Sequence, residues 1–126
     1  MFRKVLTALL AAALGTAFGA ASAAAAPKVL RVMTHSSFAV SPAVIAAFEK
    51  ANNVTVQFSS GGDGGETLNK ALLARDNPLA DVLYGVDNTF MGRALAGGIL
   101  EPYASPALKD IPADLQLDPT NRLLPV

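Results

Sequence analysis

The chain has 126 residues, of which ten are basic and ten are acidic, with 52% hydrophobic residues and no cysteine. This length suits one small domain, and the balanced charge excludes a strongly basic chain of the kind that binds nucleic acid. Without cysteine, the chain has neither a disulfide framework nor a cysteine for lipid attachment.

The first 26 residues follow the order of a secretory signal peptide. Residues 1–4 form a short basic region, residues 5–20 are uncharged and apolar, and small residues continue to Ala26. This pattern predicts a signal peptide over residues 1–23, cleaved at an A-x-A site after Ala23 or Ala26. The alternative is an uncleaved membrane anchor, because the apolar run is almost long enough to span a bilayer. Its glycines and its many alanines count against an anchor.

Loss of this segment would change the net charge. Arg3 and Lys4 would be removed, leaving eight basic and ten acidic residues, a net charge of −2. No basic patch then remains to indicate binding to nucleic acid or to an anionic membrane surface. We therefore expect a periplasmic, monomeric protein with no nucleic-acid partner.

Three units of strand, loop and helix are predicted along the remaining chain. Strands are expected at 29–34, 54–58 and 80–85, where β-branched and apolar residues dominate. Helices are expected at 42–52, at 66–73 and from Asp87-Asn88 to Gly97-Gly98. The alternation of strands and helices predicts an α/β fold with a mainly parallel open sheet and flanking helices.

The apolar positions indicate how these elements pack. The first strand is expected to be buried, and the first helix is expected to pack through Val44, Ile45 and Phe48. The second helix is expected to pack through a face that contains Leu68, Ala71 and Leu72.

Each predicted strand is followed by a polar loop. The loops cover 35–38, 59–65 and 85–88, and the second has four glycines between Gly61 and Gly65. The carboxyl ends of parallel strands share one edge of a sheet, and ligands bind in the crevice there. We therefore expect the three loops to converge on a ligand site.

The glycine-rich loop matches neither common phosphate-binding motif. The P-loop requires a lysine directly after its glycines, and the dinucleotide fingerprint requires a glycine where this chain has Thr67. Free backbone N–H groups at the helix N-terminus, with the hydroxyls of Ser59 and Ser60 nearby, would suit an anion. The carboxylate of Asp63 would suit an amine or a cationic ring. Asp63 could instead only cap the helix, and spacing alone leaves both interpretations open.

The sequence gives little support for a catalytic site or a metal site. His35 precedes Ser36 and Ser37, but adjacent side chains at a strand end usually point apart, and no G-x-S-x-G elbow is present. The acidic residues have no histidine or cysteine partners at metal-ligand spacing. We expect no catalytic residue, no metal site and no cofactor.

Three segments resemble the thiamine-binding proteins of bacterial ABC importers. They are 34–41, 60–65 and 77–90, of which Gly-Val-Asp-Asn-Thr-Phe at 85–90 is the most specific. The resemblance implies a two-lobed periplasmic binding protein that holds its ligand between α/β lobes joined by crossover strands. Residues 27–126 would then be the N-terminal part of lobe one, truncated before the crossover to lobe two. The apolar run 123–126 agrees with a natural protein that continues for roughly two hundred residues.

The resemblance also implies a function and a set of site residues. The protein would not be an enzyme and would capture thiamine or its phosphates for a membrane permease. The implied ligand-binding residues are Asp63, Gly64, Gly65, Ser60, His35, Ser36, Ser37, Phe38, Asp87 and Asn88. Two features depart from relatives: Ser36 stands where many have aspartate, and the chain has no tryptophan. Alternative cargoes are iron, a polyamine or another small solute, and the alternative class is an exported serine hydrolase.

Overall fold

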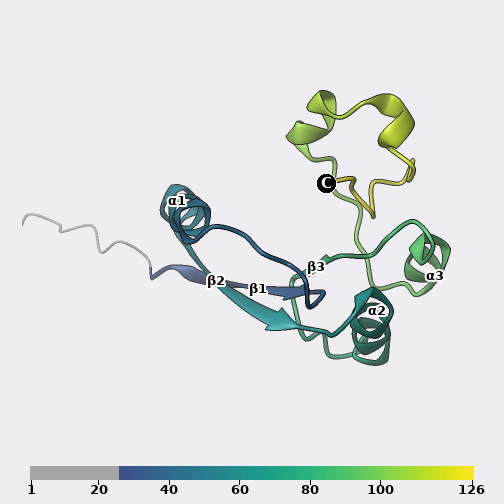
Figure 1. The fold of residues 1–126 in the computed structure, drawn as a ribbon, viewed down its shortest axis with the longest axis horizontal. Helices are drawn as coiled ribbons and strands as arrows, with labels where there is room; N and C mark the ends of the chain where they lie inside the picture. Colours follow the sequence, from purple (N-terminus) through teal and green to yellow (C-terminus); the bar gives the residue numbers. More distant parts are fainter. Residues whose placement is uncertain (1–25) are drawn as a thin grey trace, which may run out of the picture.

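A computed structural model describes residues 26–126, so the expected signal peptide lies outside the described residues. Figure 1 shows three strands, three α-helices and a C-terminal region with two short 3₁₀ helices. The strands are β1 (Lys28–Thr34), β2 (Val54–Ser60) and β3 (Val82–Tyr84). The helices are α1 (Pro42–Asn52), α2 (Gly64–Leu73), α3 (Met91–Ala96), η1 (Pro106–Asp110) and η2 (Ala113–Leu115).

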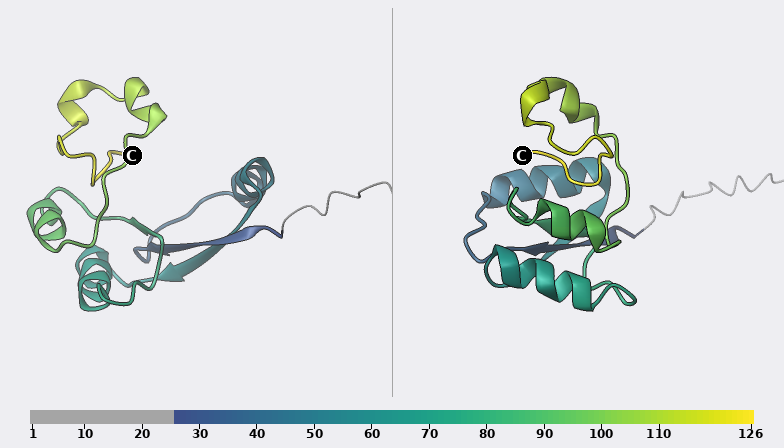
Figure 2. Two further views of the ribbon diagram at one scale, coloured as in Figure 1. Left: turned by 180° about the vertical axis from the view of Figure 1, so that it is seen from behind. Right: turned by 90° about the vertical axis from the view of Figure 1, so that its right-hand side faces the viewer.

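The three strands form one parallel sheet in the order β2-β1-β3. From β1 the chain passes through α1 to β2 at one edge of the sheet. It then passes through α2 across β1 to β3 at the other edge. Because such crossovers are right-handed, α1 and α2 lie on opposite faces of the sheet, as Figures 1 and 2 show. Gly97, at the end of α3, lies in close contact with the Leu72 side chain, so α3 packs beside α2. The predicted α/β fold with a parallel sheet and flanking helices is confirmed.

The helix boundaries follow from local capping. The Ser41 hydroxyl accepts a hydrogen bond from Val44 N, Pro42 opens α1, and Asn53 ends it in a left-handed conformation at φ 50°. α2 begins at Gly64, two residues before the predicted start, because Asp63 already provides the N-cap. Gly97 ends α3, and Gly98 follows it at φ 65°.

β3 is shorter than the strand expected at 80–85 because a side chain replaces part of its backbone pairing. Arg31 N donates a hydrogen bond of 2.8 Å to Asp81 Oδ2, while Asp81 N donates to Arg31 O, also at 2.8 Å. The Arg31 guanidinium also reaches Asp81 Oδ1 at 3.0 Å. These contacts lower the pKa of the Asp81 carboxyl, chiefly through the hydrogen bond from the Arg31 side chain. Asp81 therefore fastens β3 to β1.

The buried core is small and lies near the carboxyl end of the sheet. Leu68 and Ala94 are fully buried, and Met33 is 5% exposed. By contrast, Val44 is 59% exposed and Phe48 is 46% exposed. The expected apolar packing of α1 is thus only partly formed, because α1 lies mainly over the edge strand β2. The expectation of a buried first strand is wrong except at its last two residues.

After α3 the chain leaves the sheet and forms a separate C-terminal region, drawn from light green to yellow in Figures 1 and 2. Within the described residues, its only regular elements are η1 and η2, and side-chain hydrogen bonds help to hold it together. Gln116 Nε2, for example, donates to Leu108 O at 3.0 Å and to Ile111 O at 2.8 Å. None of the helices within residues 26–126 is long and apolar enough to cross a membrane.

Candidate functional site

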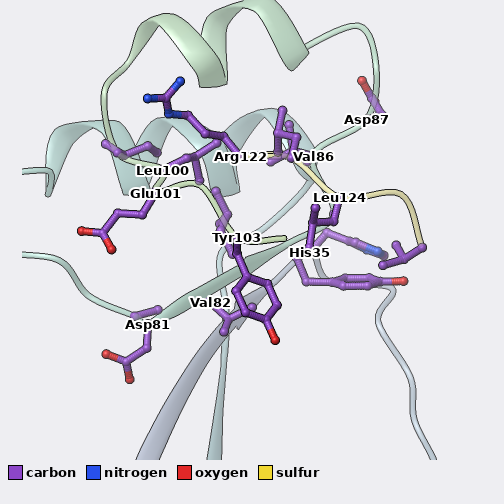
Figure 3. Close-up of a pocket in the computed structure, with 18 of the residues that line it drawn as sticks. His35, Asp81, Val82, Val86, Asp87, Leu100, Glu101, Tyr103, Arg122 and Leu124 are labelled. Atoms are coloured by element: carbon purple, nitrogen blue, oxygen red, sulfur yellow. The ribbon is translucent and has the colours of Figure 1, made fainter. Parts of the chain in front are cut away.

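A cleft of about 1150 Å³ lies at the carboxyl edge of the sheet. Its wall includes residues 35–37 after β1, residues 63–64 after β2 and residues 85–87 after β3. Segments 99–103 and 122–124 line it from the other side, and Figure 3 shows representative side chains. The three polar loops that follow the strands therefore meet at one cavity.

Backbone hydrogen bonds join the first two loops. Ser36 N donates to Gly62 O at 2.6 Å, and Gly61 N donates to Thr34 O at 2.8 Å. Gly62 has φ 103°, and a side chain there would collide with Glu66, so this turn requires glycine. At least part of the glycine content of the loop is thus explained by packing between the loop and the start of α2.

Asp63 caps α2 and also lines the cleft. Its Oδ1 accepts a hydrogen bond of 2.8 Å from Glu66 N, and Asp63 N donates to Glu66 Oε2 at 3.2 Å. This is a capping box, so the helix-cap interpretation is confirmed. Among the described residues, Asp63 Oδ2 and the N–H groups of Gly64 and Gly65 have no hydrogen-bond partner. The second carboxylate oxygen therefore stays free for another contact.

Aromatic rings stack beside the first loop. The His35 ring stacks on Tyr84 with the ring centroids 5.8 Å apart. Phe38 contacts the Tyr84 ring edge-to-face at 4.8 Å and the Phe58 ring at 5.4 Å. His35 and Tyr84 line the cleft, whereas Phe38 does not. Phe38 supports Tyr84, and Tyr84 supports His35.

Three further predicted site residues do not line the cleft. Ser60 pairs with Thr34 at the end of the β1–β2 ladder. Gly65 lies against the Phe90 ring, and Asn88 lies in the turn before α3. The residues that the structure brings together at the cleft are His35, Ser36, Ser37, Asp63, Gly64 and Asp87.

The expectation that the third helix begins at Asp87-Asn88, with these residues as its cap, is wrong. α3 begins only at Met91, and its N-cap position has no side-chain hydrogen bond. Asp87 Oδ1 instead accepts from Thr89 N at 2.9 Å and from Phe90 N at 3.3 Å, which closes a turn before the helix. A hydrogen bond from the Thr89 hydroxyl is the largest cause of the lowered pKa of Asp87. The Asp87 carboxylate is thus held at the cleft in its charged form.

Sequence reasoning missed several residues of the cleft. Tyr84 lies within the resembling segment 77–90 but was not assigned a role, and Tyr103 was not singled out. Arg122 and Leu124 belong to a segment without a recognisable motif. A hydrogen bond of 2.8 Å from Tyr103 N to Asn121 O brings this last segment to the cleft.

The charges of the cleft wall are mainly negative. Four acidic residues line it, namely Asp63, Asp81, Asp87 and Glu101, but only one arginine, Arg122. Asp81 is neutralised by Arg31, which is not part of the wall. The other three carboxylates still outnumber the single cation, so the wall favours a positively charged ligand.

The contacts of His35 do not resemble those of a catalytic base. Its Nδ1 accepts a hydrogen bond of 3.1 Å from the backbone N–H of Ser37. Among the described residues, its ring has no hydrogen bond to the hydroxyl of Ser36 or Ser37. Within residues 26–126, no group of three histidine, cysteine or acidic side chains is placed to hold a metal ion.

The sequence profile of the bacterial extracellular solute-binding proteins matches residues 34–124. The chain belongs to this family. The matched range includes all three loops of the cleft and the segment that closes its other side.

Two relatives give more detail. The chain is 33% identical over 101 residues to a thiamine-binding periplasmic protein of Brucella suis biovar 1 (strain 1330), covering 77% of this chain and 30% of that protein. It also resembles a solved structure from Trichodesmium, IdiA (FutA) in complex with iron and citrate ligands, with a TM-score of 0.64 and 26% identity. That match covers 75% of this chain and 29% of the other. The chain thus spans less than a third of the length of these relatives.

Proposed function

We propose that this protein is the exported solute-binding component of an ABC importer, and that it captures thiamine or its phosphates in the periplasm. It would act as a monomer and deliver its ligand to a membrane permease. Residues 27–126 would supply one wall of the ligand site, and a second lobe would supply the other. The protein would bind its ligand without changing it chemically.

The observation that carries this proposal is the free Asp63 Oδ2 on the negatively charged cleft wall. Thiamine combines a cationic ring with an amine-bearing ring, so a carboxylate is a suitable partner. The free N–H group of Gly64, which lines the cleft at the positive end of α2, could donate a hydrogen bond to a polar atom of the same ligand. The similarity to a thiamine-binding periplasmic protein supports the same cargo.

Iron is the second candidate cargo because the similar solved structure contains iron and citrate. Iron sites prefer several anionic or imidazole ligands together. Such a set would have to draw on groups outside residues 26–126, since the described residues offer no cluster of three. Thiamine requires only the single free carboxylate, so we rank it first.

Calorimetric titration of the complete protein from its natural gene would test the cargo. Thiamine, thiamine monophosphate, spermidine and ferric citrate should be titrated separately under the same conditions. We expect the thiamine compounds to bind and the other two to give no heat of binding. Tight binding of ferric citrate without any response to thiamine would contradict the proposed cargo and favour the iron alternative.

Two further experiments test the class and the location. A fluorophosphonate probe should leave the protein unlabelled, whereas labelling at Ser36 or Ser37 would favour the hydrolase. N-terminal sequencing of protein from the native host should find a start just after Ala23 or Ala26, in the periplasmic fraction. Membrane-bound protein that begins at Met1 would favour the uncleaved anchor instead.

A further inference from the structure

A buried carboxylate in the C-terminal region is not part of the cleft wall. Asp118 is only 5% exposed, and both of its oxygens accept hydrogen bonds. Oδ1 accepts from Thr120 N at 2.9 Å and from Thr120 Oγ1 at 2.6 Å. Oδ2 accepts from Arg122 N at 2.8 Å and from Leu123 N at 2.9 Å. These four donors, the Thr120 hydroxyl foremost, hold the pKa of Asp118 well below its usual range.

The backbone that Asp118 holds leads directly into the cleft wall. Arg122, Leu123 and Leu124 line the cavity, and Figure 3 shows Arg122 and Leu124 around it. Asn121 adopts φ 54°, donates through its N–H to Asp118 O at 3.2 Å and accepts from Tyr103 N at 2.8 Å. The turn around Asp118 thus holds the backbone of Arg122 directly and the backbone of Tyr103 through Asn121.

Little else in the described structure fixes this segment. Residues 116–126 contain no helix and no strand, so neither a ladder nor a helical turn defines their path. A carboxylate can accept on both oxygens, whereas an amide at the same place has one acceptor and one donor group. The NH₂ group of an asparagine here would face either the N–H groups of Arg122 and Leu123 or the N–H and hydroxyl groups of Thr120. Asparagine therefore cannot replace all four hydrogen bonds.

We propose that Asp118 is a positioning residue of the ligand site: it fixes the cleft wall at Arg122–Leu124 and at Tyr103 without touching the ligand. Its effect on ligand affinity rests on the proposed function, whereas its effect on the wall does not. The two parts can therefore be tested by different measurements.

The test compares Asp118→Asn with two other variants of the complete protein. Thr120→Ala removes one of the four hydrogen bonds and is the milder change. Asp114→Asn is the matched control, because Asp114 is an exposed aspartate of the same region that makes no side-chain hydrogen bond among the described residues. Amide hydrogen exchange reports on the wall, and thiamine titration reports on the site.

In Asp118→Asn we expect exchange at the amides of Arg122, Leu123 and Tyr103 to become about tenfold faster or more, and to accelerate clearly more than exchange at the β1 amides. The dissociation constant for thiamine should rise about fivefold or more. Thr120→Ala should change the same quantities about two- to threefold, and Asp114→Asn should change neither.

Unchanged exchange at Arg122 and Leu123 in both Asp118→Asn and Thr120→Ala would overturn the positioning role. Equal acceleration in β1 would overturn it as well, since Asp118 would then support global stability only. Altered wall exchange with unaltered thiamine affinity would refute the link to the ligand. A wild-type protein that does not bind thiamine would refute the proposed cargo, while the exchange data would still decide the role of Asp118.

Discussion

Replacing Asp63 with asparagine separates its two roles in the structure. Oδ1 caps α2 through Glu66 N at 2.8 Å, while Oδ2 has no partner among the described residues, and Asp63 lines the cleft. Asparagine can keep its amide oxygen at the cap and place its NH₂ group where Oδ2 was. The substitution therefore removes the charge that faces the cleft but preserves the cap.

The size of the expected effect follows from the type of hydrogen bond that is lost. A hydrogen bond to a charged group contributes about 1.5–3 kcal/mol, and the asparagine NH₂ group cannot replace it because it is a donor. Asp63 is exposed in the described structure, which lowers the expected loss to about 1–2 kcal/mol. The dissociation constant for thiamine should thus rise about five- to thirtyfold. The free energy of unfolding without ligand should change by less than about 1 kcal/mol, because asparagine also caps helices well.

Calorimetric titration of thiamine, with chemical denaturation of the ligand-free protein, measures both effects. Glu66→Gln is the matched control, because it removes a neighbouring charge that does not line the cleft and keeps an acceptor for Asp63 N. We expect it to leave thiamine affinity within about twofold of wild type. Equal affinities for wild type and Asp63→Asn would refute the reasoning and reduce Asp63 to a helix cap.

Three further predictions concern the fold. Leu68→Ala should lower the free energy of unfolding by about 3 kcal/mol, because Leu68 is fully buried, and a loss below about 1 kcal/mol in urea denaturation would contradict this. Gly85→Ala should destabilise the protein and weaken thiamine binding, because Gly85 has φ 101° and a Cβ there would collide with the His35 ring; a normal melting temperature and affinity would contradict it. Stability should be constant above about pH 5 and fall progressively below about pH 4, because the lowered pKa of Asp118 stabilises the fold only while its carboxylate is charged. The loss of stability at low pH should be smaller in Asp118→Asn than in the wild type. Identical acid denaturation curves for the two proteins would count against this.

The sequence was informative wherever the cause of a structure is local. Ser41-Pro42 marks the start of α1 because a hydroxyl cap and a proline suit the first turn of a helix. The alternation of strands and helices predicts a parallel sheet, and a parallel sheet brings the three loops to one edge. The position of the cleft could therefore be predicted before any side-chain contact was known.

Long-range contacts could not be predicted in this way. Nothing in the sequence pairs Arg31 with Asp81, which lie fifty positions apart, so the shortened start of β3 was not foreseen. The stacking of His35 on Tyr84 likewise depends on the register between β1 and β3. Asp118 differs, because an aspartate two residues before Thr120 is a recognised turn signal that sequence reasoning could have used.

Chemical-shift mapping of the complete, isotope-labelled protein with thiamine tests the central claim most directly. We predict that the backbone amides of residues 35–37, 63–64 and 85–87 shift on titration, together with those of 122–124. The turns at the opposite edge of the sheet, near Asn53 and Asn77, should not shift. Saturable shifts confined to that opposite edge, or no shifts in the three loops at saturating thiamine, would contradict it.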